Sequence, residues 1–225
     1  MSYTVVIPAR ANCNFISECL KSVYGQTLLP DEVKIVFDES DQNLNSATSL
    51  IKRQFPNVKI CMSTKSGMIS AINLGIKLSE TEYVSFLDSD DLWTENKQED
   101  QIGLLDRDQT IDVVTSNARN FIMNRLEVGG SDKWVQACTF TSATFRKSAF
   151  DKYGLVDEGS THFTWLYRWW SNANNLRINR SHINSPGLHR RIHSQNSWTL
   201  QNRTAHGELF KELRLIMNQQ DQKQG

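Results

Sequence analysis

Short apolar runs alternate with amphipathic stretches through the first half of the chain. Runs that predict buried strands occur at Tyr3–Ile7, Val33–Phe37, Val58–Met62 and Tyr83–Leu87. Helical spacing of apolar residues follows three of them, in a helix that Asn14 is expected to cap, over Leu44–Phe55, and after Gly67. Repeated strand–helix–strand steps of this length predict an α/β domain with a doubly wound, mostly parallel sheet.

The pattern changes in the second half. A charged helix precedes a predicted strand at Asp112–Ser116, and Gly129-Gly130 is typical of a turn between two extended segments. Residues 137–145 alternate small polar and apolar side chains, and an aromatic-rich helix is expected over Thr164–Asn172. There is no internal repeat and no clear linker. We therefore expect one continuous domain.

The composition limits the classes of binding partner that we expect. Among 225 residues, Lys plus Arg and Asp plus Glu number 25 each, so the net charge is zero. This balance gives no electrostatic case for nucleic acid or an anionic membrane as the main partner. No apolar run approaches the ~20 residues of a membrane span, and Met1–Ile7 has no signal-peptide pattern. We expect a cytoplasmic protein whose four scattered cysteines are reduced.

The most informative motif is the acidic run that ends the fourth predicted strand. Asp88, Ser89, Asp90 and Asp91 follow the apolar Tyr83–Leu87 directly. Three carboxylates in four residues repel one another unless a cation lies among them. Taken alone, such a run is explained equally well as a solvated turn. Ligands of open α/β sheets bind beyond the carboxyl ends of the strands, so the position favours a divalent cation that carries a diphosphate, as in a nucleotide-sugar enzyme.

Other enzymes with acidic motifs fit less well. Phosphatases of the D-x-D type and receiver domains need their acids after the first strand, where this chain has Pro8-Ala9-Arg10. Nucleotidyltransferases usually begin with a glycine-rich basic loop, and no such loop occurs here.

Four segments together resemble one family. They are VVIPARANCNFISECLKSVYGQTLLPDEVKIVFDES, SGMISAINLGIKLSETEYVSFLDSDDLW, FRKSAFDKYGLVDE and HRRIHSQNS. In this order they are similar to the family-2 glycosyltransferases over about residues 3–195. The resemblance implies the GT-A fold, with a doubly wound, mostly parallel central sheet flanked by helices and a smaller β segment on the acceptor side. It implies one domain over 1–205, with a nucleotide-sugar half at 1–115 and an acceptor half at 116–205, before a helix and polar tail at 206–225.

The resemblance also implies roles for individual residues. The expected donor-binding residues are Pro8, Ala9, Arg10, Asp38, Lys65, Gly67, Asn73, Asp88 and Ser89. Asp38 falls where the family contacts uracil, and a carboxylate facing the uracil N–H forms a charge-assisted hydrogen bond; the alternative is that Asp38 caps a turn. Asp90 is expected to bind the metal, with Asp88 beside it, Asp91 as a supporting acid and His193 as a second ligand. The alternative for His193 is an ordinary polar strand edge.

These residues would perform metal-assisted glycosyl transfer. Negative charge grows on the diphosphate leaving group, and Mg²⁺ or Mn²⁺ stabilises it. An imidazole ligand tilts the preference toward Mn²⁺. The implied donor is a UDP-sugar, and the acceptor is a glycan, a lipid or a protein.

The chain departs from the family at the catalytic base. Gly154–Glu158 and Arg168 match the family pattern, but Thr161-His162 replaces its acidic pair. We hypothesise that His162 is the general base of an inverting reaction, since a neutral imidazole accepts a proton near neutral pH. Asp157 and Glu158 are the substitutes. The alternatives are a retaining course without such a base, and a transferase-like protein that binds a nucleotide sugar without turning it over.

Overall fold

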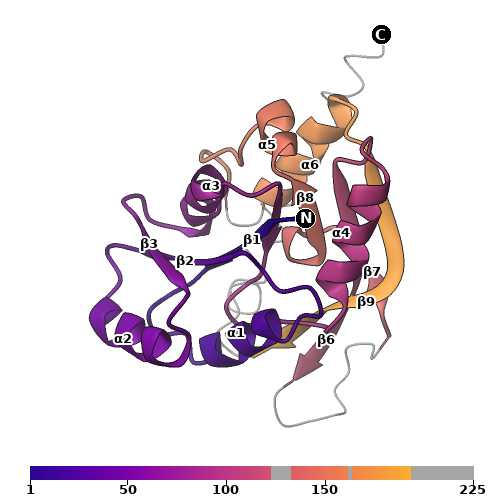
Figure 1. Ribbon diagram of the computed structural model, residues 1–225. Helices are drawn as coiled ribbons and strands as arrows, with labels where there is room; N and C mark the ends of the chain where they lie inside the picture. Colours follow the sequence, from indigo (N-terminus) through magenta and orange to yellow (C-terminus); the bar gives the residue numbers. More distant parts are fainter. Residues whose placement is uncertain (123–132, 162–163, 194–225) are drawn as a thin grey trace.

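The computed structural model describes residues 1–122, 133–161 and 164–193 (Figure 1). The first half contains β1 (Tyr3–Pro8), α1 (Ile16–Tyr24), β2 (Glu32–Asp38), α2 (Leu44–Gln54), β3 (Lys59–Ser63), α3 (Met68–Leu78) and β4 (Tyr83–Phe86). The second half contains β5 (Leu92–Trp93), α4 (Lys97–Arg107), β6 (Val113–Ile122), β7 (Val135–Gln136), η1 (Phe140–Ser142), β8 (Ala143–Arg146), α5 (Ser148–Tyr153), α6 (Trp165–Asn175) and β9 (Arg180–Ile192).

All the strands belong to one sheet. Its order is β3-β2-β1-β4-β8-β6-β9-β5, and β7 pairs with β6. The ladders that join β3, β2, β1 and β4 are parallel, as the sequence predicts for a doubly wound half. β8 runs antiparallel to both β4 and β6, whereas β6 and β9 are parallel again. The second half of the sheet is therefore mixed.

One local prediction was wrong. Asn14 does not cap α1, because the helix begins at Ile16 after Phe15 and has no side-chain cap hydrogen bond. Residues 137–145, which alternate small polar and apolar side chains, contain a 3₁₀ turn at Phe140–Ser142 before β8. The predicted Gly129-Gly130 turn and the predicted 206–225 tail lie outside the described residues.

Alternate residues of the central strands build two cores. Val5 and Ile7 belong to the core under α1, α2 and α4, whereas Val6, between them, belongs to the core under α3, α5 and α6. Figure 1 shows α1 and α2 on one face of the sheet and α3, α5 and α6 on the other. Within the described residues, no helix is both long and apolar enough to cross a membrane.

Gly75 sets how closely α3 approaches β1. A Cβ atom at this position would lie 2.2 Å from Cγ1 of Val6. Gly75→Ala should therefore force the helix away from the sheet and lower the free energy of unfolding by about 1–3 kcal/mol in urea denaturation. Gly103→Ala in α4 is the matched control, because nothing lies within 4 Å of its added Cβ. A Gly75→Ala protein as stable as the wild type would contradict this packing.

Candidate active site

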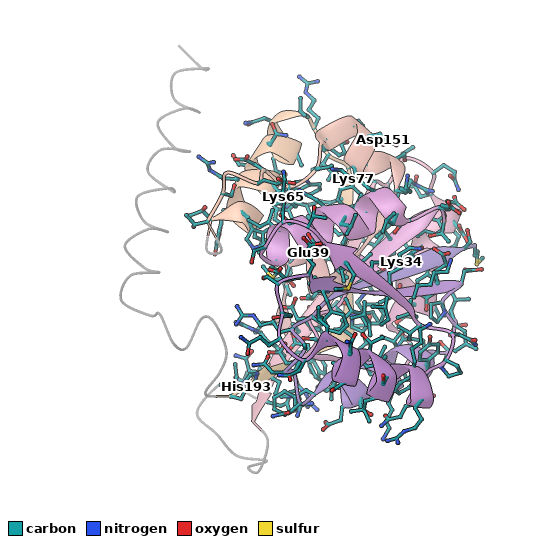
Figure 2. The ribbon with its side chains drawn as sticks, turned by 90° about the vertical axis from the view of Figure 1, so that its left-hand side faces the viewer. Lys34, Glu39, Lys65, Lys77, Asp151 and His193 are labelled. Carbon is teal, nitrogen blue, oxygen red and sulfur yellow. The ribbon has the colours of Figure 1, made fainter. Side chains whose placement is uncertain are left out.

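The carboxyl ends of β1, β2 and β4 meet at one edge of the sheet. The Ala9 N–H donates to Val36 O at 3.0 Å, and the Leu87 N–H donates to Val6 O at 3.1 Å. These bonds align the segments that follow the three strands. Figure 2 shows Lys34, near the start of β2, toward one side, and Glu39, just past its end, toward the side that also carries Lys65 and His193. The residues expected to bind the donor therefore start from neighbouring strands.

Three carboxylates gather where β4 ends. Carboxylate oxygens of Asp88, Asp90 and Asp91 all lie within 4.8 Å of one another. Burial and the neighbouring Asp90 raise the pKa of Asp88 to about 7. Burial and the charges of Asp88 and Asp90 also raise the pKa of Asp91 well above its ordinary value. Because the cluster disfavours its own negative charge and offers hard oxygen ligands, these residues fit a divalent cation.

His193 lies beside this cluster. Its Nε2 atom is 2.9 Å from Oδ2 of Asp90, although 103 positions separate the two residues. The imidazole ring also packs 5.0 Å from the ring of Phe15. The structure therefore brings together Asp90 and His193, which are expected to bind the metal along with Asp88. The imidazole of His193 beside Asp90, together with the carboxylates of Asp88 and Asp91 that lie close to Asp90, suits Mn²⁺ or Mg²⁺.

Arg191 is a site residue that the sequence analysis did not assign. Its Nε donates to the Asp90 carbonyl oxygen at 2.8 Å, and its backbone N–H donates to Oδ1 of Asp91 at 2.8 Å. Its Nη2 forms an ion pair with Glu18 on α1, also at 2.8 Å. The signal was present, because Arg191 and His193 form an Arg-x-His pattern within HRRIHSQNS, the last of the segments that resemble the family.

Thiols from the α1 region also touch the acidic turn. The Cys13 Sγ donates to the Ser89 carbonyl oxygen at 3.5 Å, and the Cys19 Sγ donates to that of Asp88 at 3.6 Å. All four cysteines are free, as expected. These two hydrogen bonds hold the backbone of the acidic turn and do not involve its side chains.

Asp38 ends β2 in a network of donors. Its Oδ1 accepts from the Ser40 N–H at 3.0 Å and the Ser40 Oγ at 2.7 Å, and its Oδ2 accepts from the Gly67 N–H at 3.3 Å. Hydrogen bonds from Ser66 and Ser40 lower the pKa of Asp38 to about 2, so it stays ionised. Gly67, with φ at +106°, occupies backbone space that favours glycine and begins α3. Asp38 thus caps this turn, and its contact with uracil stays a prediction.

Asn73 holds the 154–158 turn against α3. Its side chain is buried, its Nδ2 donates to Val156 O at 2.8 Å, and its Oδ1 accepts from the Val156 N–H at 3.0 Å. These bonds give Asn73 a structural role, and its expected role near the diphosphate stays a prediction.

The acids of the 154–158 turn are both paired. Asp157 accepts from the Gly159 N–H at 3.0 Å and forms an ion pair with Arg168 at 2.9 Å. Glu158 forms an ion pair with Lys65. The hydrogen bond from the Gly159 N–H, with the nearby Arg168, lowers the pKa of Asp157. The hydrogen bond from Lys65 lowers the pKa of Glu158. Lowered pKa values make both acids weaker bases, and His162 lies outside the described residues.

The sheet is parallel in its first half and mixed in its second, and a carboxylate cluster lies at the carboxyl end of β4. This arrangement defines a protein of the GT-A type. The chain belongs to glycosyl transferase family 2, whose model matches residues 4–168. The match includes the acidic turn, Asp38 and Asp157, and ends at Arg168.

Curated relatives carry the same kind of name. The chain is 34% identical over 108 residues to the uncharacterized glycosyltransferase RC0461 of Rickettsia conorii, an alignment that covers 48% of this chain and 18% of that protein. It is 30% identical over 142 residues to the uncharacterized glycosyltransferase alr2836 of Nostoc sp., covering 62% of this chain and 41% of that protein. The matches thus span less than half the length of these relatives.

Solved structures share the fold. TarS 1–349 of S. aureus in complex with UDP-GlcNAc has a TM-score of 0.69 at 16% identity, covering 96% of this chain and 65% of that one. The complex of TarS 1–349 with UDP has a TM-score of 0.65 at 18% identity, covering 86% and 61%. At this level of identity the likeness establishes the fold, and it confirms the GT-A architecture that the sequence predicts.

Proposed function

We propose that this chain transfers a sugar from a nucleotide-diphosphate donor, a UDP-sugar, to a glycan, lipid or protein acceptor with the aid of Mn²⁺ or Mg²⁺. The observation that carries the proposal is the cluster of Asp88, Asp90 and Asp91 at the carboxyl end of β4, with His193 2.9 Å from Asp90. Membership of family 2 and the UDP and UDP-GlcNAc complexes of TarS support a UDP-sugar as the donor.

The residues at the carboxyl end of β4 then have separate roles. Asp90 and His193 would hold the cation, and Asp88 would bind the ribose side of the donor. When bound, the cation supplies positive charge beside the diphosphate as it leaves. Asp91 is tied to the backbone of β9 and supports the turn from within.

The nucleotide is bound at the ends of β1 and β2. Pro8 and Ala9 are partly exposed and Arg10 is exposed, so all three offer surface to the base and ribose. The ionised Asp38 accepts the uracil N–H. Gly67 allows a close approach at the start of α3, and Ser89 lies between the two acids of the D-x-D motif. Lys65, at the same side, is paired with Glu158.

Calorimetry with UDP tests the donor class. We expect UDP to bind in the presence of Mn²⁺ and to lose at least about tenfold in affinity with EDTA, which is ~1.4 kcal/mol. GDP at the same concentrations is the control for the base. Binding of GDP but not UDP would move the donor class, and failure of both would refute the proposal.

A hydrolysis screen separates an enzyme from a binding protein. UDP release from a set of UDP-sugars with Mn²⁺ should identify one preferred donor. Tight UDP binding without release from any UDP-sugar, with or without acceptors, would instead favour the transferase-like binding protein.

A further inference from the structure

Arg191 joins three parts of the chain that are distant in sequence. It lies near the end of β9 and touches α1 through Glu18, the acidic turn through Asp90, and β6 through Phe121. Its Cζ atom is 4.3 Å from the ring centroid of Phe15 and 4.7 Å from that of Phe121. The guanidinium therefore donates hydrogen bonds through its N–H groups, and the rings of Phe15 and Phe121 pack against it.

The burial of this guanidinium is unusual. The side chain of Arg191 is 1% exposed, whereas the side chain of its partner Glu18 is 52% exposed. Arginine is almost never fully buried unless it is paired, because an unpaired buried charge costs several kcal/mol. The carboxylate, the Asp90 carbonyl and the two aromatic rings offset that cost. An apolar side chain could fill this space without needing polar partners, so the burial of a guanidinium here calls for a functional explanation.

The contacts of Arg191 fix the geometry of the metal site. Its side chain holds the carbonyl of Asp90 while its backbone N–H holds the carboxylate of Asp91, so the peptide that joins the two acids has one orientation. Two residues further along, His193 reaches Asp90. The end of β9 and the backbone of the acidic turn are therefore joined through the side chain and the backbone N–H of one residue.

We propose that Arg191 is a positioning residue that docks the end of β9 onto the acidic turn, so that Asp90 and His193 converge on one cation. The inference rests on the proposed function for the identity of that cation and its nucleotide. Arg191 itself touches neither. The competing explanation is that Arg191 contributes only to the stability of the fold.

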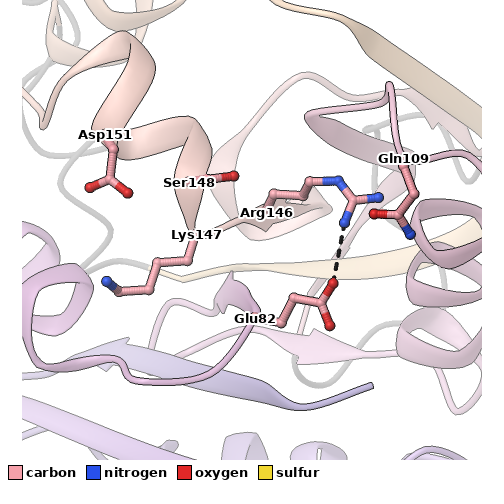
Figure 3. Close-up of a pocket in the computed structure, with 6 residues that line it drawn as sticks. All are labelled: Glu82, Gln109, Arg146, Lys147, Ser148 and Asp151. Atoms are coloured by element: carbon pink, nitrogen blue, oxygen red, sulfur yellow. Dashed lines mark hydrogen bonds and ion pairs between the residues drawn. The ribbon is translucent and has the colours of Figure 1, made fainter.

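Arg146 offers a matched control for stability. It is also buried, at 8% exposed, with Nε donating to Ile111 O at 2.9 Å, a second bond to Leu105 O and an ion pair with Glu82. Its Cζ lies 5.4 Å from the ring centroid of Tyr83. Because Arg146 pairs with the first residue of β4, it lies at the opposite end of that strand from the acids. Figure 3 shows it pointing to Glu82 in a pocket lined by Glu82, Gln109, Arg146, Lys147, Ser148 and Asp151.

The experiment compares Arg191→Met with Arg146→Met and the wild type. Three measurements are made: the Tm, the Kd for UDP with Mn²⁺ and with EDTA, and hydrogen exchange of peptides spanning 87–94 without metal. We expect both variants to lower the Tm. Only Arg191→Met should weaken UDP binding with Mn²⁺, by at least about tenfold, with little effect in EDTA and with faster exchange at 87–94.

Arg191→Lys and Glu18→Gln sharpen the result. Lysine keeps the charge but lacks the planar fork that reaches Glu18 and the Asp90 carbonyl together, so its Kd should lie between those of the wild type and Arg191→Met. In Glu18→Gln, Arg191 keeps its hydrogen bond to the Asp90 carbonyl, so the Kd for UDP should stay within about twofold of the wild type. If Arg191→Met does not fold, Arg191→Lys carries the same comparison.

Two outcomes separate this inference from the proposed function. If Arg191→Met lowers the Tm but keeps the wild-type Kd and exchange at 87–94, Arg191 is structural only and the inference is wrong. If the wild type itself binds no UDP with Mn²⁺, the proposed function fails. Exchange at 87–94 then decides alone whether Arg191 holds the acidic turn.

Discussion

Replacing Asp90 by asparagine is expected to abolish metal-dependent transfer while the fold stays intact. The amide keeps the shape of the side chain but removes the carboxylate that faces His193 and that is proposed to bind the cation. The strand before it does not depend on that charge, since Tyr83, Val84 and Phe86 are held by burial. We expect a loss of at least about 10³-fold in turnover, or ~4 kcal/mol, because a positioned cation contributes several kcal/mol to such reactions.

Initial rates of UDP release at saturating Mn²⁺, together with the Tm, check this prediction. The Tm of Asp90→Asn should equal or slightly exceed that of the wild type, because one of three mutually repelling carboxylates is gone. Asp151→Asn is the control, since this exposed acid on α5 lies in the pocket at the far end of β4. Turnover of Asp90→Asn near the wild-type rate, still dependent on metal, would mean that the cation is held elsewhere.

Much of the first half of the fold was predictable because three of its strands are buried on both faces. Such strands appear in the sequence as short continuous apolar runs, and β1, β2 and β4 all have this form. The second half gives no such signal. We predicted a strand over Asp112–Ser116, but β6 continues to Ile122 through a mostly polar segment.

The reason is long-range pairing. Residues Asn117–Ile122 of β6 are paired with Pro186–Ile192 of β9, and neither segment has an apolar pattern of its own. β9 spans 13 residues, and the sequence analysis did not predict it as a strand. Backbone hydrogen bonds between these two segments, more than local side-chain preference, determine this part of the sheet.

The same limit applies to the site. Motifs indicated the acids and His193 as candidates, because these residues carry ligand atoms and lie in segments that resemble the family. They could not predict that Arg191 and Lys97 would each be 1% exposed, since both residue types are almost always at the surface. Nor could they predict that the amide of Asn73 would be used by Val156, 83 positions away. Burial of a polar group depends on partners that are distant in sequence.

His162→Ala is expected to remove transfer while UDP and Mn²⁺ still bind. The inverting reaction needs a group that accepts the proton of the attacking hydroxyl, and loss of a general base costs about 10²–10⁴-fold in rate. The structure weakens the two substitutes, because Arg168 and Lys65 pair with Asp157 and Glu158 and their pKa values are lowered. The prediction for His162 itself rests on the sequence.

The pH profile gives an independent measurement of the base. An imidazole accepts a proton only when neutral, so wild-type activity should fall below about pH 6 if His162 keeps its ordinary pKa of ~6.5. Carboxylates with lowered pKa values would instead keep activity well below that pH. Asp157→Asn and Glu158→Gln are the matched variants, and each should lose much less activity than His162→Ala. If His162→Ala transfers sugar normally and the profile stays flat to lower pH, the role passes to Asp157 or Glu158 or the reaction is retaining. The anomeric configuration of the product then decides between these two.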